Sequence, residues 1–324
     1  RKFDAWVGVS HGMTELLTSR GFDPQRLYPL YNGVDFSHIP PVVSREEYLK
    51  GLGLEVQEDT VVYGIAARIN PVKDMETLVR AFAQALKECP NIRLVIAGEG
   101  EQEALIRGLA EELCPKNTVF FAGWVKDMYS FYNALDVNLL TSLSETFPYS
   151  ITEGARAGLP TVASRVGGIP YLIEHGVTGL LFEAGDPDGL ARQLAALASD
   201  ADLRARLAQR LHEKAKNEFS LESTLRRQLD IYQAVLRKEA RKKALPSHRD
   251  GVLICGAYGR GNAGDDAILE AIVREVRSID SALPVWVLSR TPPQTRLQYR
   301  VNAIYTFNVF RFLLRMRKTS LYIN

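Results

Sequence analysis

The sequence predicts an α/β protein of the doubly wound class, in which helices cover both faces of a parallel sheet. Apolar, strand-like segments alternate with helical patterns through residues 61–164, which is typical of βαβ units. Glycine-containing loops follow several of these strands, and the whole pattern restarts after residue 250. We therefore expect a Rossmann-like domain followed by the start of a second Rossmann-like α/β unit.

The first strand of the main domain is expected at VVYGI, residues 61–65. A helix is expected over 74–88, because apolar residues recur there at helical spacing: Met75, Leu78, Val79, Phe82 and Leu86. RLVIAG forms the next strand, ends at Gly98 and leads into the helix EQEALIRGLAEEL. The alternation continues in VFFAGW, VNLLTS and PTVAS, at 119–124, 137–142 and 160–164. The sequence thus predicts five strands in one domain, which we place at residues 41–236 with its trailing helices.

The segments that flank this domain differ from it. Residues 1–40 hold one strand, the helix HGMTELLTSR and the short strand RLYPLYN, which is too little for a core of their own. Because the chain also begins with Arg1 rather than Met, we interpret them as the remnant of a preceding domain. Residues 237–250 are expected to be a basic linker. Residues 251–324 are expected to be a partial domain with the strands VLICG and VWVLS around the helix AILEAIVREVRSI.

Composition limits the functional class. Of the 324 residues, 46% are hydrophobic and 24% are charged, with a net charge of +2, which is typical of a soluble globular protein and gives no case for a nucleic-acid partner. Cys89, Cys114 and Cys255 lack metal-ligand spacing, so we expect a cytoplasmic location and no metal. No apolar run reaches the roughly 18 to 20 residues that span a membrane.

Two carboxylates, Glu145 and Glu153, stand eight positions apart in SETFPYSITEGARAG. Because proline suits the first turn of a helix, a helix is expected from near Pro148 to about Ala157, with Glu145 in the loop before it. The two carboxylates could be an acid and a base, favourable charges at a helix start, or groups that hold a ligand. The start of this helix also offers amides that favour an anion, those of Phe147, Tyr149 and Ser150.

Two cations favour the ligand-holding interpretation. Arg68 and Lys73 follow the strand VVYGI and so belong to the same carboxyl edge of the sheet, where open α/β sheets bind ligands. Two cations at that edge can neutralise a diphosphate. Loops after the strands also carry glycines, which allow a sharp turn or a close approach of the backbone to a ligand: Gly98, Gly100, Gly167 and Gly168. We expect these groups to surround one crevice.

Five motifs follow one another along the chain: AARINPVKD, AGEGE, FAGWV, SETFPYSITE and VGGIPYLIEHGVTGLLFEAGD. In this order they resemble the carboxy-terminal nucleotide-sugar domain of retaining glycosyltransferases of family 4, which have the GT-B fold. The resemblance covers about residues 1–240, and the two glutamates with seven residues between them match the family signature. It implies transfer of a sugar from a nucleoside diphosphate to a glycan or lipid-linked acceptor, with retention, in cell-envelope polysaccharide assembly, and it implies no cofactor.

The resemblance also implies roles for single residues. Arg68 and Lys73 would bind the donor diphosphate and stabilise its developing charge without a metal. Glu145 would hold hydroxyls of the donor sugar, so that the catalytic set is Arg68, Lys73 and Glu145, and Glu153 would accept hydrogen bonds from the ribose. Further donor contacts are implied for Gly98, Glu99, Val125, Phe147, Tyr149 and Ser150.

The sequence departs from the family at Asp74 and Pro148, where glycine is common, and at Tyr171, where an acidic residue is common. The acceptor side of this fold belongs to its first domain. Neither His11 nor His38 has the context of a catalytic base, so we assign none and expect this chain to bind a donor without turnover. A non-catalytic nucleotide-sugar-binding module is the alternative.

GRGNAG, residues 259–264, matches the dinucleotide fingerprint between a strand and a helix. Asp265 and Asp266 would repel a pyrophosphate there, so the alternative of an NADP-linked oxidoreductase would have to use Arg290. GAYGRGNAGDDAILEAI instead resembles the amino-terminal motif of polysaccharide pyruvyl transferases, which transfer pyruvyl from phosphoenolpyruvate to a glycan. The matching residues are Gly261, Asn262, Gly264, Asp265 and Asp266. A tight turn with an Asp cap is the third interpretation.

The chain has two basic stretches, residues 237–249 and RFLLRMRK at 311–318. Each stretch has two interpretations. Basic residues beside apolar ones favour anionic lipid, which would place the protein at the inner face of the membrane. A solvated linker and a half-buried helix are the other interpretation.

Overall fold

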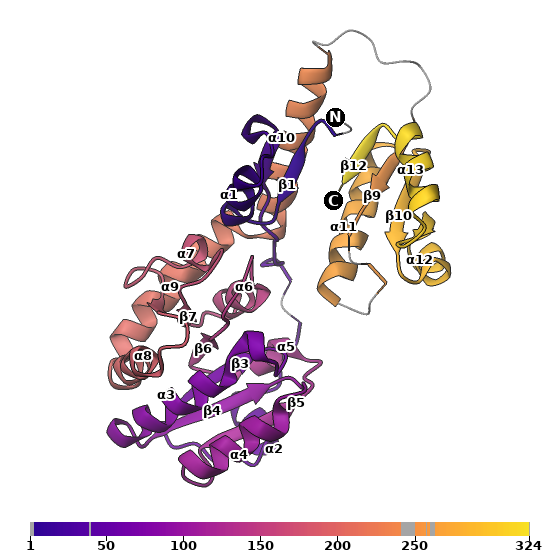
Figure 1. Ribbon diagram of the computed structural model, residues 1–324. Coiled ribbons are helices and arrows are strands. Elements are labelled where there is room, and N and C mark those ends of the chain that lie inside the picture. The colour runs from indigo at the N-terminus through magenta and orange to yellow at the C-terminus, as the bar shows by residue number, and fades with distance from the viewer. Residues whose placement is uncertain (1–2, 39, 241–249, 257, 260–262, 324) are drawn as a thin grey trace. The chain divides into compact units, whose positions relative to one another are not determined.

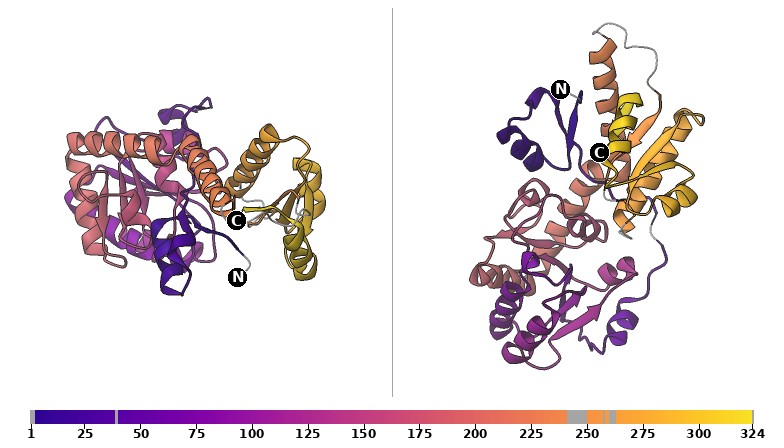
Figure 2. Two further views of the ribbon diagram at one scale, coloured as in Figure 1. Left: turned by 90° about the horizontal axis from the view of Figure 1, so that it is seen from above. Right: turned by 45° about the vertical axis from the view of Figure 1, so that its right-hand side comes forward.

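The structure is a computed structural model, and it describes residues 3–38, 40–240, 250–256, 258–259 and 263–323. The chain forms two compact units, residues 1–235 and 236–324. Most of their elements are labelled in Figure 1, and Figure 2 shows them from two further sides. Among the described helices, none combines the length and the apolar character that crossing a bilayer requires.

Six parallel strands form the main sheet of the first unit, in the order β5-β4-β3-β6-β7-β8 (Figure 1). Their bounds are β3 Val61–Ala66, β4 Ile92–Ala97, β5 Val119–Gly123, β6 Val137–Leu140, β7 Thr161–Ser164 and β8 Leu180–Phe182. The prediction of five strands is wrong by one, because β8 has only three residues and therefore shows no alternation in the sequence. Its pairing with β7 decides that it is a strand.

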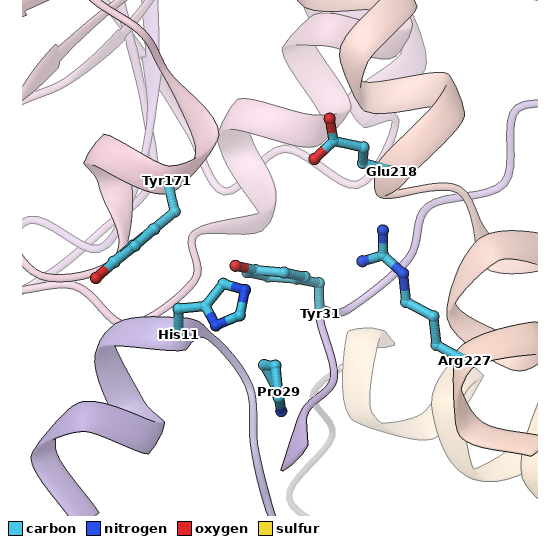
Figure 3. Close-up of a pocket in the computed structure, with 6 residues that line it drawn as sticks. All are labelled: His11, Pro29, Tyr31, Tyr171, Glu218 and Arg227. Carbon is cyan, nitrogen blue, oxygen red and sulfur yellow. The ribbon is translucent and has the colours of Figure 1, made fainter. Parts of the chain in front are cut away.

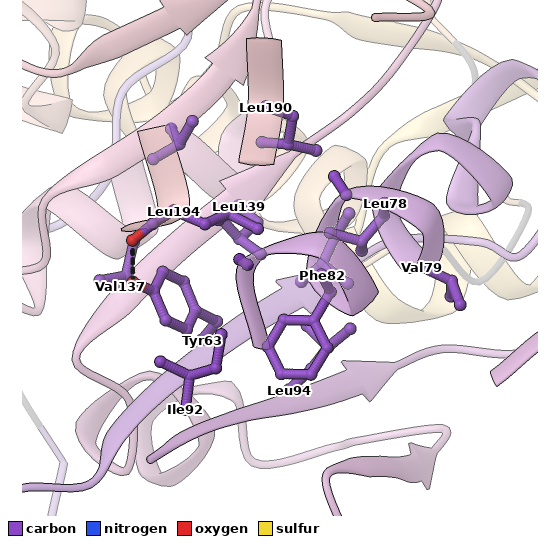
Figure 4. Close-up of a cluster of buried hydrophobic side chains, with 14 of the residues drawn as sticks. Tyr63, Leu78, Val79, Phe82, Ile92, Leu94, Val137, Leu139, Leu190 and Leu194 are labelled. Carbon is purple, nitrogen blue, oxygen red and sulfur yellow. Dashed lines mark hydrogen bonds between the residues drawn. The ribbon is translucent and has the colours of Figure 1, made fainter. Parts of the chain in front are cut away.

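Helices cover both faces of this sheet, as the doubly wound class requires. They are α2 Arg45–Gly51, α3 Met75–Glu88, α4 Glu103–Leu113, α5 Met128–Asn133, α6 Tyr149–Arg156, α7 Ile169–Leu172, α8 Pro187–Ser199 and α9 Ala201–Glu218. The last helix of this unit, α10 Leu221–Ala240, contacts the amino-terminal segment instead. Consecutive strand residues point to opposite faces, so Tyr63 packs under α3 and α8 while Val62 packs beside α2 and α5. In Figure 4 the Tyr63 hydroxyl donates a hydrogen bond to the Leu194 carbonyl of α8, at 2.7 Å.

The amino-terminal segment has the predicted strand, helix and strand: β1 Trp6–Gly8, α1 His11–Ser19 and β2 Leu27–Pro29. The two strands pair in parallel. Tyr31 packs its ring against Phe147, with ring centroids 5.4 Å apart, and against Phe219, at 5.1 Å. This segment therefore borders the loop that carries Glu145.

The second unit has a four-stranded parallel sheet in the order β11-β10-β9-β12. Its elements are β9 Val252–Ile254, α11 Ala263–Ile279, β10 Val285–Ser289, α12 Pro292–Tyr299, β11 Asn302–Tyr305, α13 Val309–Lys318 and β12 Leu321–Ile323. Both units thus confirm the predicted class of α/β folds with parallel, Rossmann-like sheets. Because α10 continues to Ala240, the first four residues of the expected linker are helical. Residues 241–249, and with them most of that linker, lie outside the described residues.

Candidate functional site

The structure brings two of the predicted site residues into contact at the carboxyl edge of the main sheet. Lys73 ends a short 3₁₀ helix, Pro71–Lys73, that follows β3, and Glu145 lies in the loop after β6. Because β3 and β6 are neighbours, the Lys73 ammonium forms an ion pair with Oε1 of Glu145. The side chains of Lys73 and Glu145 are only 25% and 12% exposed, so their charges are screened less than those of a surface pair.

Buried hydroxyl groups hold both members of this ion pair. Ser142 donates from Oγ to Oε1 of Glu145 at 2.9 Å, and Thr141 donates from Oγ1 to the carbonyl of Lys73 at 2.7 Å. Both residues are fully buried. Neither residue was predicted from the sequence, although two hydroxyl residues at the end of the apolar segment VNLLTS were a usable signal.

Gly167 and Gly168 lie against the backbone of the Glu145 loop. A Cβ on Gly167 would come within 1.8 Å of the Glu145 carbonyl oxygen, and one on Gly168 within 1.8 Å of the Thr146 carbonyl oxygen. The Gly168 amide donates to the Glu145 carbonyl at 3.1 Å. These glycines therefore serve the packing of one loop on another, which fixes the position of Glu145.

Gly98 and Gly100 pack in the same manner on the loop that follows β3. A Cβ on Gly98 would come within 2.0 Å of the Ala67 carbonyl oxygen, and one on Gly100 within 2.1 Å of the Ile69 carbonyl oxygen. The Ile69 amide in turn donates to the Glu99 carbonyl at 3.0 Å. The loops after β3 and β4 thus form one unit of backbone beside Arg68.

Arg68 differs from Lys73 in its surroundings. Its side chain is exposed, and within the part of the chain that the structure describes it forms no ion pair. Asp74, where the resemblance leads one to expect glycine, has the left-handed conformation with φ of 46°, which explains why glycine suits this position. The Asp74 carboxylate also accepts from the Thr77 amide at 3.3 Å and so caps α3.

Helix α6 begins at Tyr149, directly after Pro148, as the sequence predicts. Glu153 lies one turn inside it and accepts a hydrogen bond from the Tyr132 hydroxyl at 3.1 Å. Burial raises the pKa of Glu153, and the Tyr132 hydroxyl and the Arg156 guanidinium only partly oppose this shift. Tyr132 is another contact that the sequence analysis missed, because nothing in the sequence pairs α5 with α6.

We expect Glu153→Gln to stabilise the protein near neutral pH. The folded protein holds the Glu153 proton more tightly than the unfolded chain, so this group's contribution to stability is full below its ordinary pKa of 4.5 and is lost as pH rises through the higher folded pKa. Glutamine keeps the acceptor for Tyr132 and carries no charge at any pH. Urea unfolding should therefore show a gain at about pH 7 that disappears below about pH 4.5.

The control for this measurement is Glu101→Gln, which changes an exposed carboxylate at the same sheet edge. It should alter the free energy of unfolding by no more than about 0.5 kcal/mol at either pH. A loss of stability in Glu153→Gln near neutral pH would contradict the predicted burial cost.

The other predicted donor contacts have different environments. Glu99 is exposed at the edge, and Val125 is half-buried against the cluster that contains Tyr132. The Phe147 side chain is core, because it is only 5% exposed, so only its backbone can serve a ligand. Pro148 offers no side-chain acceptor to the first turn of α6.

A separate cavity of about 380 Å³ is shown in Figure 3. One of its lining residues, Tyr31, packs against Phe147 at the end of the loop that carries Glu145. The lining residues of the cavity come from the amino-terminal segment and from α7, α9 and α10, and they are His11, Pro29, Tyr31, Tyr171, Glu218 and Arg227. The Tyr171 hydroxyl donates to Glu15 of α1 at 2.8 Å. His11 thus lines this cavity rather than the edge that holds Lys73.

Comparison with known proteins decides the family. The model of the family described as "Glycosyl transferases group 1" matches residues 45–216, which is more than half of the chain and includes the whole sheet edge. The chain belongs to the group 1 glycosyl transferases. This membership agrees with the prediction that the chain contains a glycosyltransferase domain.

Relatives of this chain differ in the reactions for which they are named. The chain is 28% identical over 243 residues to N-acetyl-alpha-D-glucosaminyl L-malate synthase of Bacillus anthracis. The aligned region covers 74% of this chain and 62% of that protein. The chain is 33% identical over 170 residues to the lipopolysaccharide core biosynthesis glycosyltransferase LpsE of Rhizobium meliloti, which covers 52% of this chain and 49% of that protein. The chain therefore spans about half to two thirds of the length of these relatives.

Solved structures confirm the GT-B assignment of the fold. Anabaena Alr3699/HepE, crystallised in complex with UDP, matches with a TM-score of 0.62 and 23% identity over 74% of this chain and 64% of that one. The C-terminal domain of a group 1 protein from Francisella tularensis, LpcC, matches with a TM-score of 0.52 and 23% identity over 58% of this chain and 100% of that one.

Proposed function

We propose that the first unit binds the nucleoside diphosphate sugar of a retaining glycosyltransferase, which transfers the sugar to a glycan or lipid-linked acceptor in cell-envelope polysaccharide assembly. The observation that carries this proposal is the Lys73–Glu145 ion pair at the carboxyl edge of the sheet, near the exposed Arg68. Two cations beside a ring of backbone loops suit a diphosphate. The LpsE relative supports a role in the cell envelope.

In this proposal each residue acts through binding and charge. Arg68 and Lys73 neutralise the diphosphate and stabilise the negative charge that grows as it leaves, so no metal or other cofactor is needed. Glu145 exchanges part of its contact with Lys73 for hydroxyls of the donor sugar. Glu153 accepts hydrogen bonds from the ribose, while the amides of Tyr149 and Ser150 face the donor at the start of α6.

Calorimetry with UDP, GDP and ADP tests the proposal directly on this chain. At least one nucleotide should bind, and uridine, guanosine or adenosine alone should bind far more weakly, because the two cations then have no partner. Glu153→Gln should lower the affinity for the favoured nucleotide by about tenfold, since a neutral amide is a poorer hydrogen-bond acceptor than a carboxylate.

The control is again Glu101→Gln, which should bind as the unchanged chain does. Because Glu153→Gln is expected to be more stable, weaker binding cannot be ascribed to unfolding. Equal nucleotide affinity in all three proteins, or no binding by any of them, would refute the assignment.

For the second unit we propose the start of a pyruvyl transferase domain. Asp265 and Asp266 lie in the first turn of α11, where they disfavour the pyrophosphate of a dinucleotide. Gly264 is in the same helix, whereas Gly261 and Asn262 lie outside the described residues. The Arg290 guanidinium, which an NADP site would need, lies over the Phe307 ring at 5.4 Å. NADPH fluorescence should therefore not change when the protein is added.

We further propose a cytoplasmic location at the inner face of the membrane.

A further inference from the structure

Helix α13 of the second unit has a face that is fixed on its own sheet. Met316 is buried, and Arg315 lies over the Trp286 ring of β10 at 4.5 Å. Arg315 also forms an ion pair with Asp250 at 2.8 Å. The rotation of the helix about its axis is therefore set by these contacts.

The opposite face of α13 is apolar although it is exposed. Phe310 is 74% exposed, Leu313 40% and Leu314 45%, and Phe307, just before the helix, is 62% exposed. A helix that packs one face on a sheet is expected to carry polar side chains on the other. We call these four side chains, together with the exposed Arg311, Arg317 and Lys318, the α13 surface.

Most charged side chains near the α13 surface are basic, and Asp250 is the acidic group that pairs with one of them, Arg315. Residues 281–324 contain seven basic side chains and no Asp or Glu. Arg311, Arg317 and Lys318 form no ion pair within the described residues, and Arg290 lies over the Phe307 ring. The exposed apolar side chains are thus bordered by three cations, Arg311, Arg317 and Lys318, that form no ion pair within the described residues.

We propose that the α13 surface binds the surface of an anionic lipid bilayer. Exposed aromatic and aliphatic side chains enter the boundary between headgroups and acyl chains, and neighbouring basic side chains contact anionic headgroups. A second copy of this chain fits less well, because a twofold contact of the α13 surface would bring like charges together. The proposal is independent of the function proposed for the first unit.

Sedimentation of the full chain with vesicles tests this proposal. Vesicles of phosphatidylcholine with phosphatidylglycerol should bind the protein, and phosphatidylcholine vesicles should bind it much more weakly. Arg311→Gln with Arg317→Gln should lower the partition coefficient by about 25-fold, at about fivefold for each charge. Phe310→Ser with Leu314→Ser should lower binding strongly while the charge stays the same.

The matched control is Arg206→Gln with Arg210→Gln on α9, which removes two exposed charges from the first unit and should leave vesicle binding unchanged. Circular dichroism checks that each variant is folded. Equal binding to neutral and anionic vesicles, or full binding by the Phe310→Ser, Leu314→Ser variant, would overturn the proposal. So would a dimer in sedimentation velocity that this variant abolishes while vesicle binding persists.

Discussion

Replacing Lys73 with methionine is expected to lower the affinity of this chain for the nucleoside diphosphate that calorimetry shows it to bind, for example UDP, by about ten- to a hundredfold. A hydrogen bond to a charged group contributes about 1.5 to 3 kcal/mol, and each 1.4 kcal/mol is about a tenfold change in affinity. Methionine keeps most of the aliphatic stem and removes the ammonium. Titration calorimetry measures the loss, with Lys87→Met at the far end of α3 as the control.

Glu145→Gln should have the opposite effect on free UDP. Glu145 now pairs with Lys73, so its neutralisation leaves the ammonium free for the diphosphate, and UDP should bind at least as tightly as before. A UDP-sugar should lose its advantage over UDP, because the carboxylate that receives the sugar hydroxyls is gone. Weaker binding of both ligands to Glu145→Gln would show that Glu145 maintains the shape of the site and does not receive the sugar. Unchanged UDP binding by Lys73→Met would show that Lys73 does not contact the diphosphate.

Gly167→Ala is expected to abolish UDP binding and to destabilise the first unit by at least about 2 kcal/mol. The new Cβ would lie 1.8 Å from the carbonyl oxygen of Glu145, which is backbone and has no rotamer that avoids it. The loop of Glu145 must therefore move away from Lys73. Urea unfolding and UDP calorimetry together measure the two effects.

Gly176→Ala separates this clash from simple backbone strain. Gly167 and Gly176 both have positive φ, of 50° and 75°, but a Cβ on Gly176 meets nothing within 4 Å. Gly176→Ala should therefore cost about 1 kcal/mol and keep UDP binding. Equal losses in the two variants would mean that the left-handed conformation, and not the packing of the loops, is what requires glycine at position 167.

Local sequence patterns were enough to predict the sheet edge at which Lys73 and Glu145 meet. Arg68, Lys73 and Glu145 could be assigned to one edge because each follows an apolar strand, and parallel strands end at the same edge. The start of α6 could be predicted from Pro148 alone, since proline restricts both its own backbone and that of its neighbour. The short strand β8 could not, because three residues carry no periodicity.

The sequence by itself determined the parallel α/β class, the order of its long elements and the edge where the charged residues gather, because these depend on periodicity and on local backbone preference. Only the tertiary structure decided that Lys73 pairs with Glu145 and that hydrogen bonds from Ser142 and Tyr132 hold the two glutamates. It also decided that the Glu145 carbonyl occupies the space that a Cβ on Gly167 would need. Each of those contacts joins side chains or loops from different elements, and the distance between them is set by packing.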